Sequence, residues 1–222
     1  MIKSKRGNKH FKLNNAVMDN TQDDFMLLGD TAFKVATYSE VQNTHHIHIK
    51  GEITEPEDYV DLLNFLYTVP SNDEVNLHIN SGGGNVDTAN EIISAIQVCP
   101  AVVNGHIHGY CASAATGILL ACHNYVVGEG ATFMIHCVST GYYGKLPDML
   151  SHGDHLKRMG LNTLNNWYEG LLSKDEITNV SKGTDLWFCA DEIRDRLTKR
   201  SEYLNGQRED DVEVDTPKQL LS

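Results

Sequence analysis

The segment Gly109-Tyr-Cys-Ala-Ser-Ala-Ala-Thr-Gly117 lies where an apolar, β-branched approach gives way to a run of helical character. Residues 101–103 (Ala-Val-Val) lead into it, and residues 117–121 (Gly-Ile-Leu-Leu-Ala) lead out of it. Ser113 is therefore predicted at a strand-to-helix turn, among small residues and beside helix amides that no helix carbonyl has claimed. Such a serine could be a nucleophile, or the small residues could simply let a helix pack closely on a sheet. By itself the segment favours packing.

Short apolar runs alternate with amphipathic segments on both sides of this turn. Beside the strand leading to Ser113, strands are predicted at residues 46–51, 75–80, 125–128 and 132–136. This alternation predicts an α/β fold of βαβ units with a mostly parallel sheet and right-handed crossovers. Ligands bind such sheets at the carboxyl ends of the strands. Gly84, Ser113 and His136 all stand at predicted strand ends.

Two helix starts carry the pattern of a capping box, in which a hydroxyl and a glutamate three residues later satisfy free amides. The first is Thr54 with Glu57, and the second is Ser173 with Glu176.

Composition excludes several functional classes. The net charge of −12 and the pI of about 5.3 argue against binding to nucleic acid or to an anionic membrane. No apolar run approaches the ~20 residues of a membrane span, and no apolar core follows the basic N-terminal residues, so no secretory signal is predicted. Five cysteines without CxxC spacing indicate reduced, packed thiols. We therefore expect a cytoplasmic protein.

Three groups could carry chemistry, and each has a structural alternative. The glycines at 82–84 do not fit the phosphate-binding patterns GK[ST] or GxGxxG, which leaves an oxyanion hole or a tight turn. His136 could be a general base or an ordinary residue at a strand end. Asp185 could be a helix cap or the group that orients an imidazole.

Together these groups match a family. The motifs that carry the match are Asn80-Ser-Gly-Gly-Gly84, Gly109-Tyr-Cys-Ala-Ser113-Ala, Met134-Ile-His136 and Asp185-Leu-Trp-Phe-Cys-Ala-Asp-Glu192. In this order they resemble the proteolytic subunit of the Clp protease (the ClpP family), over roughly residues 45–200. The resemblance implies a ClpP/crotonase-like fold with an extended strand-helix handle.

The resemblance also implies a mechanism: ATP-independent peptide-bond hydrolysis by a serine endopeptidase. Ser113 would be the nucleophile, His136 its general base and Asp185 the orienter of His136. The amides of Gly84 and Ala114 would form the oxyanion hole. Substrate-binding positions would be Gly83, Gly141, Tyr142 and Tyr143. No metal or cofactor would be required.

The implied assembly is a homo-oligomer, two stacked heptameric rings that enclose the sites and admit polypeptide substrates. We expect a flexible arm at residues 1–30, a peptidase domain at 31–200 with its handle at about 139–172, and an acidic tail at 201–222. At the positions where the family presents apolar side chains to an unfoldase ATPase, this chain has Asn76, His78, His106 and His108. An apolar side chain of the ATPase would bury less apolar area against these polar residues. Docking of a standard Clp ATPase is therefore expected to be weakened.

The histidines of the predicted strands have two interpretations. His46, His48, His78, His106 and His108 could hold a metal, but ligation requires convergence that a sequence does not reveal. We interpret them as polar residues on exposed strand faces or at subunit contacts.

Two alternative functions stay open. One is a crotonase-like acyl-CoA enzyme in which the amides of Gly84 and Ala114 polarise a thioester, although no CoA-binding segment is evident. The other is a ClpP-like processing or assembly component, for example in viral capsid maturation, that is not coupled to a Clp ATPase.

Overall fold

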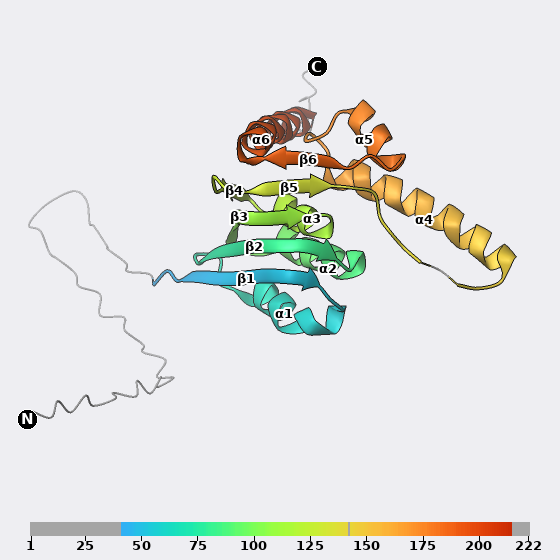
Figure 1. Cartoon of the computed structure of the whole chain (residues 1–222). Coiled ribbons are helices and arrows are strands. Elements are labelled where there is room, and N and C mark those ends of the chain that lie inside the picture. Colours follow the sequence, from blue (N-terminus) through green and yellow to red (C-terminus); the bar gives the residue numbers. More distant parts are fainter. Residues whose placement is uncertain (1–40, 142, 215–222) are drawn as a thin grey trace, which may run out of the picture. The chain divides into compact units, whose positions relative to one another are not determined.

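The computed structural model describes residues 41–141 and 143–214, and the fold below is that of the unit that begins at Gln42. Strands and helices alternate along most of this unit (Figure 1). Their order is β1 (Thr44–Ile53), η1 (Pro56–Tyr59), α1 (Val60–Thr68), β2 (Glu74–Gly84), α2 (Val86–Gln97), β3 (Val102–Ala112), α3 (Ala114–Ala121), β4 (Asn124–Val127), β5 (Thr132–Ile135), α4 (Leu146–Trp167), α5 (Lys174–Ser181), β6 (Leu186–Cys189) and α6 (Ala190–Val214).

The strands form one mixed sheet in the order β1-β2-β3-β5-β6. β3 is long enough to have two neighbours on one side: β4 pairs with its first half and β5 with its last residues. All of these pairs are parallel except β5 with β6, which is antiparallel. The predicted βαβ units and mostly parallel sheet are confirmed.

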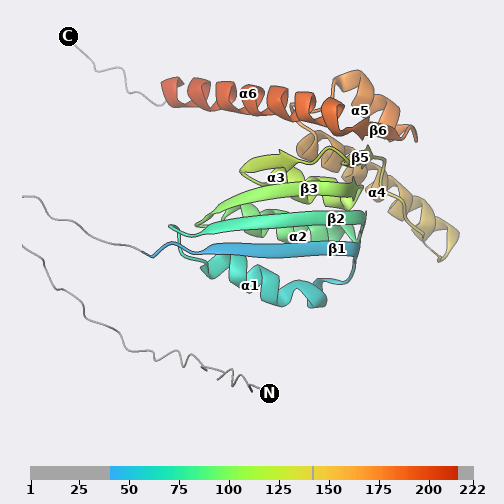
Figure 2. The same ribbon diagram turned by 60° about the vertical axis from the view of Figure 1, so that its left-hand side comes forward.

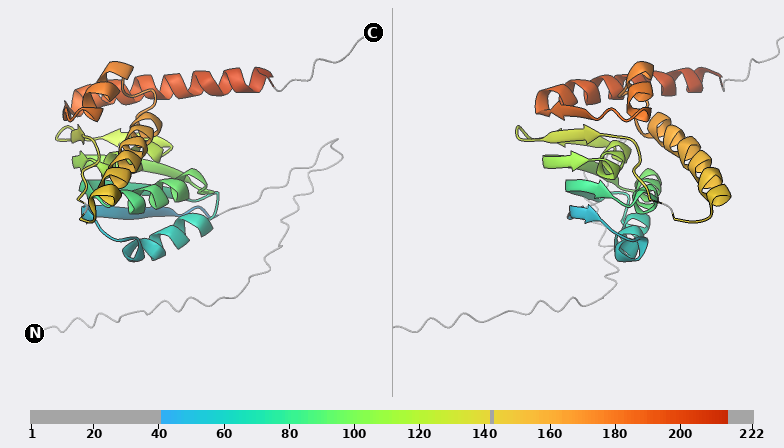
Figure 3. Two further views of the ribbon diagram at one scale, coloured as in Figure 1. Left: turned by 90° about the vertical axis from the view of Figure 1, so that its right-hand side faces the viewer. Right: turned by 45° about the vertical axis from the view of Figure 1, so that its right-hand side comes forward.

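Helices α1, α2 and α3 cover one face of the sheet, as Figures 2 and 3 show from three directions. In β2, Leu77 and Ile79 point into this layer and are buried, whereas His78 and Asn80 point to the opposite face. This alternation follows from the two-residue period of a strand. Burial of each large aliphatic side chain contributes about 1.5–3 kcal/mol. The core includes Ile92, Ile96, Ile107, Ile118, Leu119 and Phe133.

Three parallel strands end at the same edge of the sheet. β2 ends at Gly84, β3 at Ala112 and β5 at Ile135. Ser113 and His136 are the next residues after β3 and β5, so the chain brings the predicted chemical groups to one edge. The predicted strand ends are confirmed.

Helix α4 extends away from this edge of the sheet (Figure 1). Its C-terminal end is anchored by Leu164 and the following Tyr168, both buried, whereas Leu146, Met149 and Leu150 near its start are exposed. Most of the predicted handle at 139–172 consists of α4 together with the connection that precedes it.

One of the two predicted capping boxes is present. Ser173 Oγ accepts from Glu176 N–H at 3.3 Å, and Glu176 Oε2 accepts from Ser173 N–H at 2.8 Å. The prediction for Thr54 is wrong: η1 begins after Glu55 without a side-chain cap, and Thr54 Oγ1 instead donates to Asp58 Oδ2 at 2.6 Å. Pro56 stands at the first position of η1, where its missing N–H leaves no bond unmade.

The five cysteines are all free, as predicted. Cys99, Cys111 and Cys122 are buried, whereas Cys137 is half-buried and Cys189 is exposed, so the prediction of packed thiols holds for the first three.

The last helix passes the predicted domain boundary. The backbone of α6 is helical to Val214, so residue 200 falls inside the helix and the acidic run 209–213 belongs to it. The predicted arm at 1–30 and residues 215–222 of the predicted tail lie outside the described residues.

Candidate active site

Ser113 has an unusual backbone conformation. With φ 54° and ψ −128°, it is the only non-glycine residue at positive φ in the described part of the chain. Such a conformation costs about 1–3 kcal/mol and persists only where neighbouring structure enforces it. Here the Ser113 N–H donates to the carbonyl of Met134 at 2.9 Å, which ties the turn to β5. A serine on a sharp strand-to-helix turn presents its hydroxyl at the sheet edge, as in a nucleophile elbow.

The hydroxyl of Ser113 is hydrogen-bonded to the imidazole of His136. A serine at the N-cap of a helix usually accepts from the helix amides, but the Ser113 side chain makes no such bond with α3. Its Oγ lies 2.6 Å from His136 Nε2 instead. When Nε2 is the unprotonated nitrogen, the hydroxyl donates to it, and the imidazole is positioned to remove the proton.

Asp185 does not join this pair in the structure. It is exposed in the connection between α5 and β6. Within residues 41–141 and 143–214, no hydrogen bond or ion pair links a carboxylate to the His136 imidazole. The structure therefore brings together two members of the predicted triad, and the orienting role of Asp185 stays a prediction.

The glycine turn after β2 passes directly beside the nucleophile. Gly83 has φ +91°, and a Cβ there would lie 2.7 Å from Ser113 Cβ and 2.8 Å from the Ala114 nitrogen. Gly84 has φ +147°, and a Cβ there would collide with the backbone of Ile53. Only glycine fits at both positions, because they combine a left-handed backbone with close approach.

Ser113 and His136 open into a cavity of about 250 Å³. Gly84 and Ala114, the predicted oxyanion residues, both line it beside Ser113. Thus one cavity holds a hydroxyl, an imidazole and residues from two backbone turns, one of which begins a helix. Amides at a helix start are available to stabilise a developing negative charge.

The far wall of the cavity comes from α4 and the residue after it. Thr163, Leu164, Trp167 and Tyr168 line it. Tyr168 is buried, and its hydroxyl lies 2.6 Å from Thr116 Oγ1, which in turn donates to the Ser113 carbonyl at 2.6 Å. Burial raises the pKa of Tyr168, so it stays a neutral donor. This chain of hydrogen bonds connects the end of α4 to the nucleophile turn.

These α4 residues are the ones that sequence reasoning missed. Leu164, Trp167 and Tyr168 form a helical apolar stripe, the usual signal of core packing. No local signal separates a stripe that packs on the core from one that also lines a cavity.

The predicted substrate-binding residues are placed differently from one another. Gly83 contacts the nucleophile turn but does not line the cavity, and Gly141 and Tyr143 are exposed and do not line it either. Tyr142 lies outside the described residues. An adjoining cavity of about 190 Å³ shares Val138 and Leu164 with the first, which extends the groove along α4.

No helix in the described part of the chain combines the length and apolarity needed to cross a membrane.

Comparison with known proteins places these features in context. Residues 30–212 match the Clp protease family. Among solved structures, a mutant of ClpP1 from Listeria monocytogenes superposes with a TM-score of 0.58 at 24% sequence identity, covering 68% of this chain and 86% of that chain. This likeness supports the predicted ClpP/crotonase-like fold. No curated protein sequence matches the chain.

Proposed function

The chain belongs to the Clp protease family, and from this premise we propose that it is a serine endopeptidase with Ser113 as nucleophile and His136 as general base. The observation that carries the proposal is the 2.6 Å contact between Ser113 Oγ and His136 Nε2 at a positive-φ turn. A buried structural serine would not require this strained backbone.

The chemistry would proceed in two steps. Ser113 Oγ attacks the scissile carbonyl carbon while His136 Nε2 takes the hydroxyl proton. The imidazolium then gives that proton to the leaving amine as the C–N bond breaks, leaving an acyl-enzyme. Water, deprotonated by the same imidazole, hydrolyses the ester and restores Ser113.

The amides of Gly84 and Ala114 would stabilise the oxyanion of each tetrahedral intermediate. Their residues line the cavity beside Ser113, and loss of one such donor costs about 3–4 kcal/mol of transition-state stabilisation in comparable sites. We propose that Asp185 orients His136 once the connection between α5 and β6 moves toward it, because in the present conformation no carboxylate of the described residues contacts that imidazole.

The proposed working form is a homo-oligomeric chamber. Proteins of the Clp protease family typically form rings. Helix α4 presents exposed Leu146, Met149 and Leu150 on a segment that projects from the sheet edge, and such a surface favours contact with further copies. We propose two stacked heptameric rings, joined through the handle.

Operation without a standard Clp ATPase is favoured by the polar character of the open sheet face. Asn76, His78, His106 and His108 lie on this face, which α1–α3 do not cover. A partner that inserts an apolar side chain would bury little apolar area there.

The test is covalent labelling by a fluorophosphonate, which reacts with activated serines. Wild type and the control Ser94→Ala, which changes an exposed helix serine, should be labelled and should cleave casein. Ser113→Ala should do neither. Equal labelling of Ser113→Ala and wild type would show that the nucleophile is misassigned. Saturable binding of a CoA ester together with absent proteolysis would favour the crotonase-like alternative.

A further inference from the structure

Five histidines (His46, His48, His78, His106 and His108) lie on the face of the sheet that α1–α3 do not cover, and none of them lines the cavity beside Ser113. His48, His78 and His106 occupy one row across β1, β2 and β3, because His48 pairs in register with His78 and His78 with His106. His108 lies two residues after His106 on the same strand face. Their rings are in contact: the centroids of His48 and of His106 each lie 4.7 Å from that of His78.

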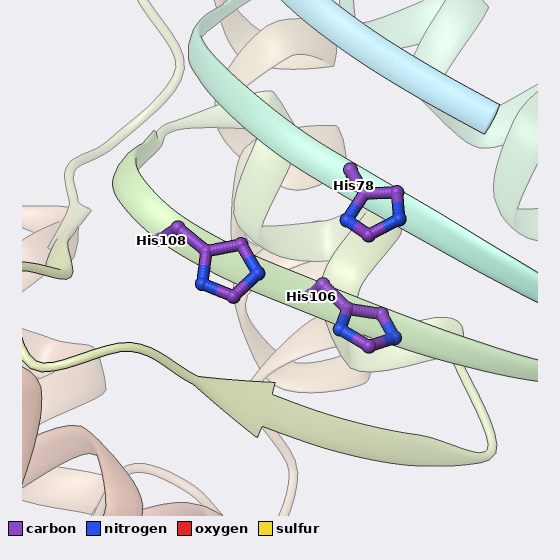
Figure 4. A group of neighbouring side chains, drawn as sticks. All are labelled: His78, His106 and His108. Atoms are coloured by element: carbon purple, nitrogen blue, oxygen red, sulfur yellow. The ribbon is translucent and has the colours of Figure 1, made fainter. Parts of the chain in front are cut away.

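Three of these imidazoles converge. His78, His106 and His108 each offer a ring nitrogen, and the three nitrogens lie within 4.8 Å of one another. Figure 4 shows the three rings projecting to the same side of β2 and β3, with the His108 ring directed toward His106. Around a tetrahedral Zn²⁺ with Zn–N bonds of about 2.0–2.1 Å, nitrogens lie about 3.3 Å apart. Small side-chain rotations on an open face would close this gap.

The surroundings of His106 are those of a metal ligand. Its Nε2 lies 2.8 Å from Asn76 Oδ1. An amide oxygen only accepts, so His106 Nε2 carries the hydrogen, and Nδ1 retains a lone pair. Asn76 is only 7% exposed, and its Nδ2 donates to Glu74 Oε1 at 3.3 Å, which sets the amide orientation. Metal-binding histidines commonly donate their second N–H to such a partner.

The surroundings of His78 and His106 favour their neutral imidazoles. Burial, followed by the neighbouring imidazoles, lowers the pKa of both His78 and His106. A lowered pKa favours the neutral imidazole, which is the form that ligates a metal; the site itself rests on the convergence of the three ring nitrogens. The neighbouring imidazoles satisfy few of one another's ring nitrogens. Among the described residues, one hydrogen bond joins two imidazoles, between His46 Nδ1 and His78 Nε2 at 3.0 Å.

We propose that His78, His106 and His108 bind one divalent transition-metal ion, with Zn²⁺ as the expected occupant. Imidazole nitrogen suits Zn²⁺, Cu²⁺ and Ni²⁺. Three protein ligands leave one coordination position open, for water or for a donor from a further molecule. The site is separate from Ser113 and His136, so it does not depend on the proposed peptidase function.

The experiment is a Zn²⁺ titration of the full, tag-free chain by calorimetry, with a chromophoric chelator in competition. Wild type should bind one Zn²⁺ per chain. The variants His78→Asn, His106→Asn and His108→Asn should each bind at least about tenfold more weakly, and Asn76→Ala should weaken binding by about 10–100-fold through loss of the partner of His106. Circular dichroism checks that each variant is folded.

Two controls locate the metal. His155→Asn removes an exposed histidine of α4, and His136→Asn removes the imidazole of the candidate active site; neither should change the affinity. Absence of stoichiometric binding overturns the proposal. So does an affinity that survives in all three cluster variants, or that is lost in His136→Asn.

Discussion

Ser113 Oγ and His136 Nε2 lie 2.6 Å apart although the residues are 23 positions apart in the chain. The contact exists because β3 and β5 are parallel neighbours that end at the same sheet edge. The Ser113 N–H bond to the Met134 carbonyl adds a second link between the same strand ends.

Replacement of His136 by Asn should lower kcat/KM for a peptide substrate by at least about a thousandfold, because the general base is lost while the cavity remains. The melting temperature should be nearly unchanged, since His136 is a half-buried residue at a strand end. Peptidase kinetics and thermal melting measure the two effects. Activity within tenfold of the His155→Asn control would contradict a role as general base.

Gly83→Ala should abolish activity and destabilise the fold by about 1–3 kcal/mol. The alanine would have to adopt the left-handed backbone of Gly83, which is strained for it, and its Cβ would collide with Ser113. The matched control is Gly153→Ala in α4, where a Cβ meets open space. That change should stabilise the helix by about 0.5–1 kcal/mol. Chemical denaturation compares both variants with wild type, and an active, stable Gly83→Ala protein would refute the close packing described above.

Asp185→Asn tests the residue that stands apart from the pair. Because Asp185 is exposed and without a partner among the described residues, stability should change by less than about 0.5 kcal/mol. If it orients His136 during turnover, kcat should fall by up to about 10⁴-fold. The exposed Asp175→Asn provides the control. Unchanged kcat in Asp185→Asn would remove Asp185 from the mechanism.

Tyr168→Phe should destabilise the protein by about 1 kcal/mol, since Thr116 Oγ1 loses a buried hydrogen-bond donor. Tyr67→Phe, at a half-exposed position, should be neutral in the same denaturation experiment. Equal stability of the two variants would mean that the Thr116–Tyr168 bond does not anchor α4.

The Glu176–Arg196 pair predicts a stability loss in acid. Its 2.6 Å ion pair is the main reason that the pKa of Glu176 is lowered from 4.5 to about 2. A carboxyl group whose pKa is lower in the folded than in the unfolded protein stabilises the fold at any pH above its unfolded pKa. This contribution of Glu176 is therefore present at neutral pH and is lost as the pH falls from about 4.5 to about 2. Glu176→Gln should be less stable at neutral pH by about 1 kcal/mol, with part of the cap lost.

The unfolding free energy, measured as a function of pH, distinguishes the Glu176–Arg196 pair from the exposed ion pairs. Between pH 4.5 and 2, the unfolding free energy of Glu176→Gln should fall less steeply than that of wild type. Glu129→Gln breaks an exposed ion pair with Arg194 and should leave both stability and its pH dependence nearly unchanged. Parallel pH profiles for wild type and Glu176→Gln would contradict the assignment.

Local patterns determined much of this protein in advance. Strand alternation and helix stripes predicted the βαβ order and placed Gly84, Ser113 and His136 at strand ends, because these signals depend on residues close in sequence. The capping box at Ser173 was predicted for the same reason. The box at Thr54 failed because the helical turn begins one residue later, after Glu55, and the Thr54 hydroxyl donates to Asp58 instead of accepting from a helix amide.

Only the tertiary structure decided which of these residues meet. The sheet register brings His78 of β2 beside His106 and His108 of β3. The packing of α4 makes Trp167 and Tyr168 line the same cavity as Ser113. The tertiary structure also leaves Asp185 without a hydrogen bond to His136, although the sequence around Asp185 resembles the family motif. Periodicity reports which face of an element is apolar. Distances between elements depend on strand register and helix packing across the whole unit, and no short stretch of sequence encodes them.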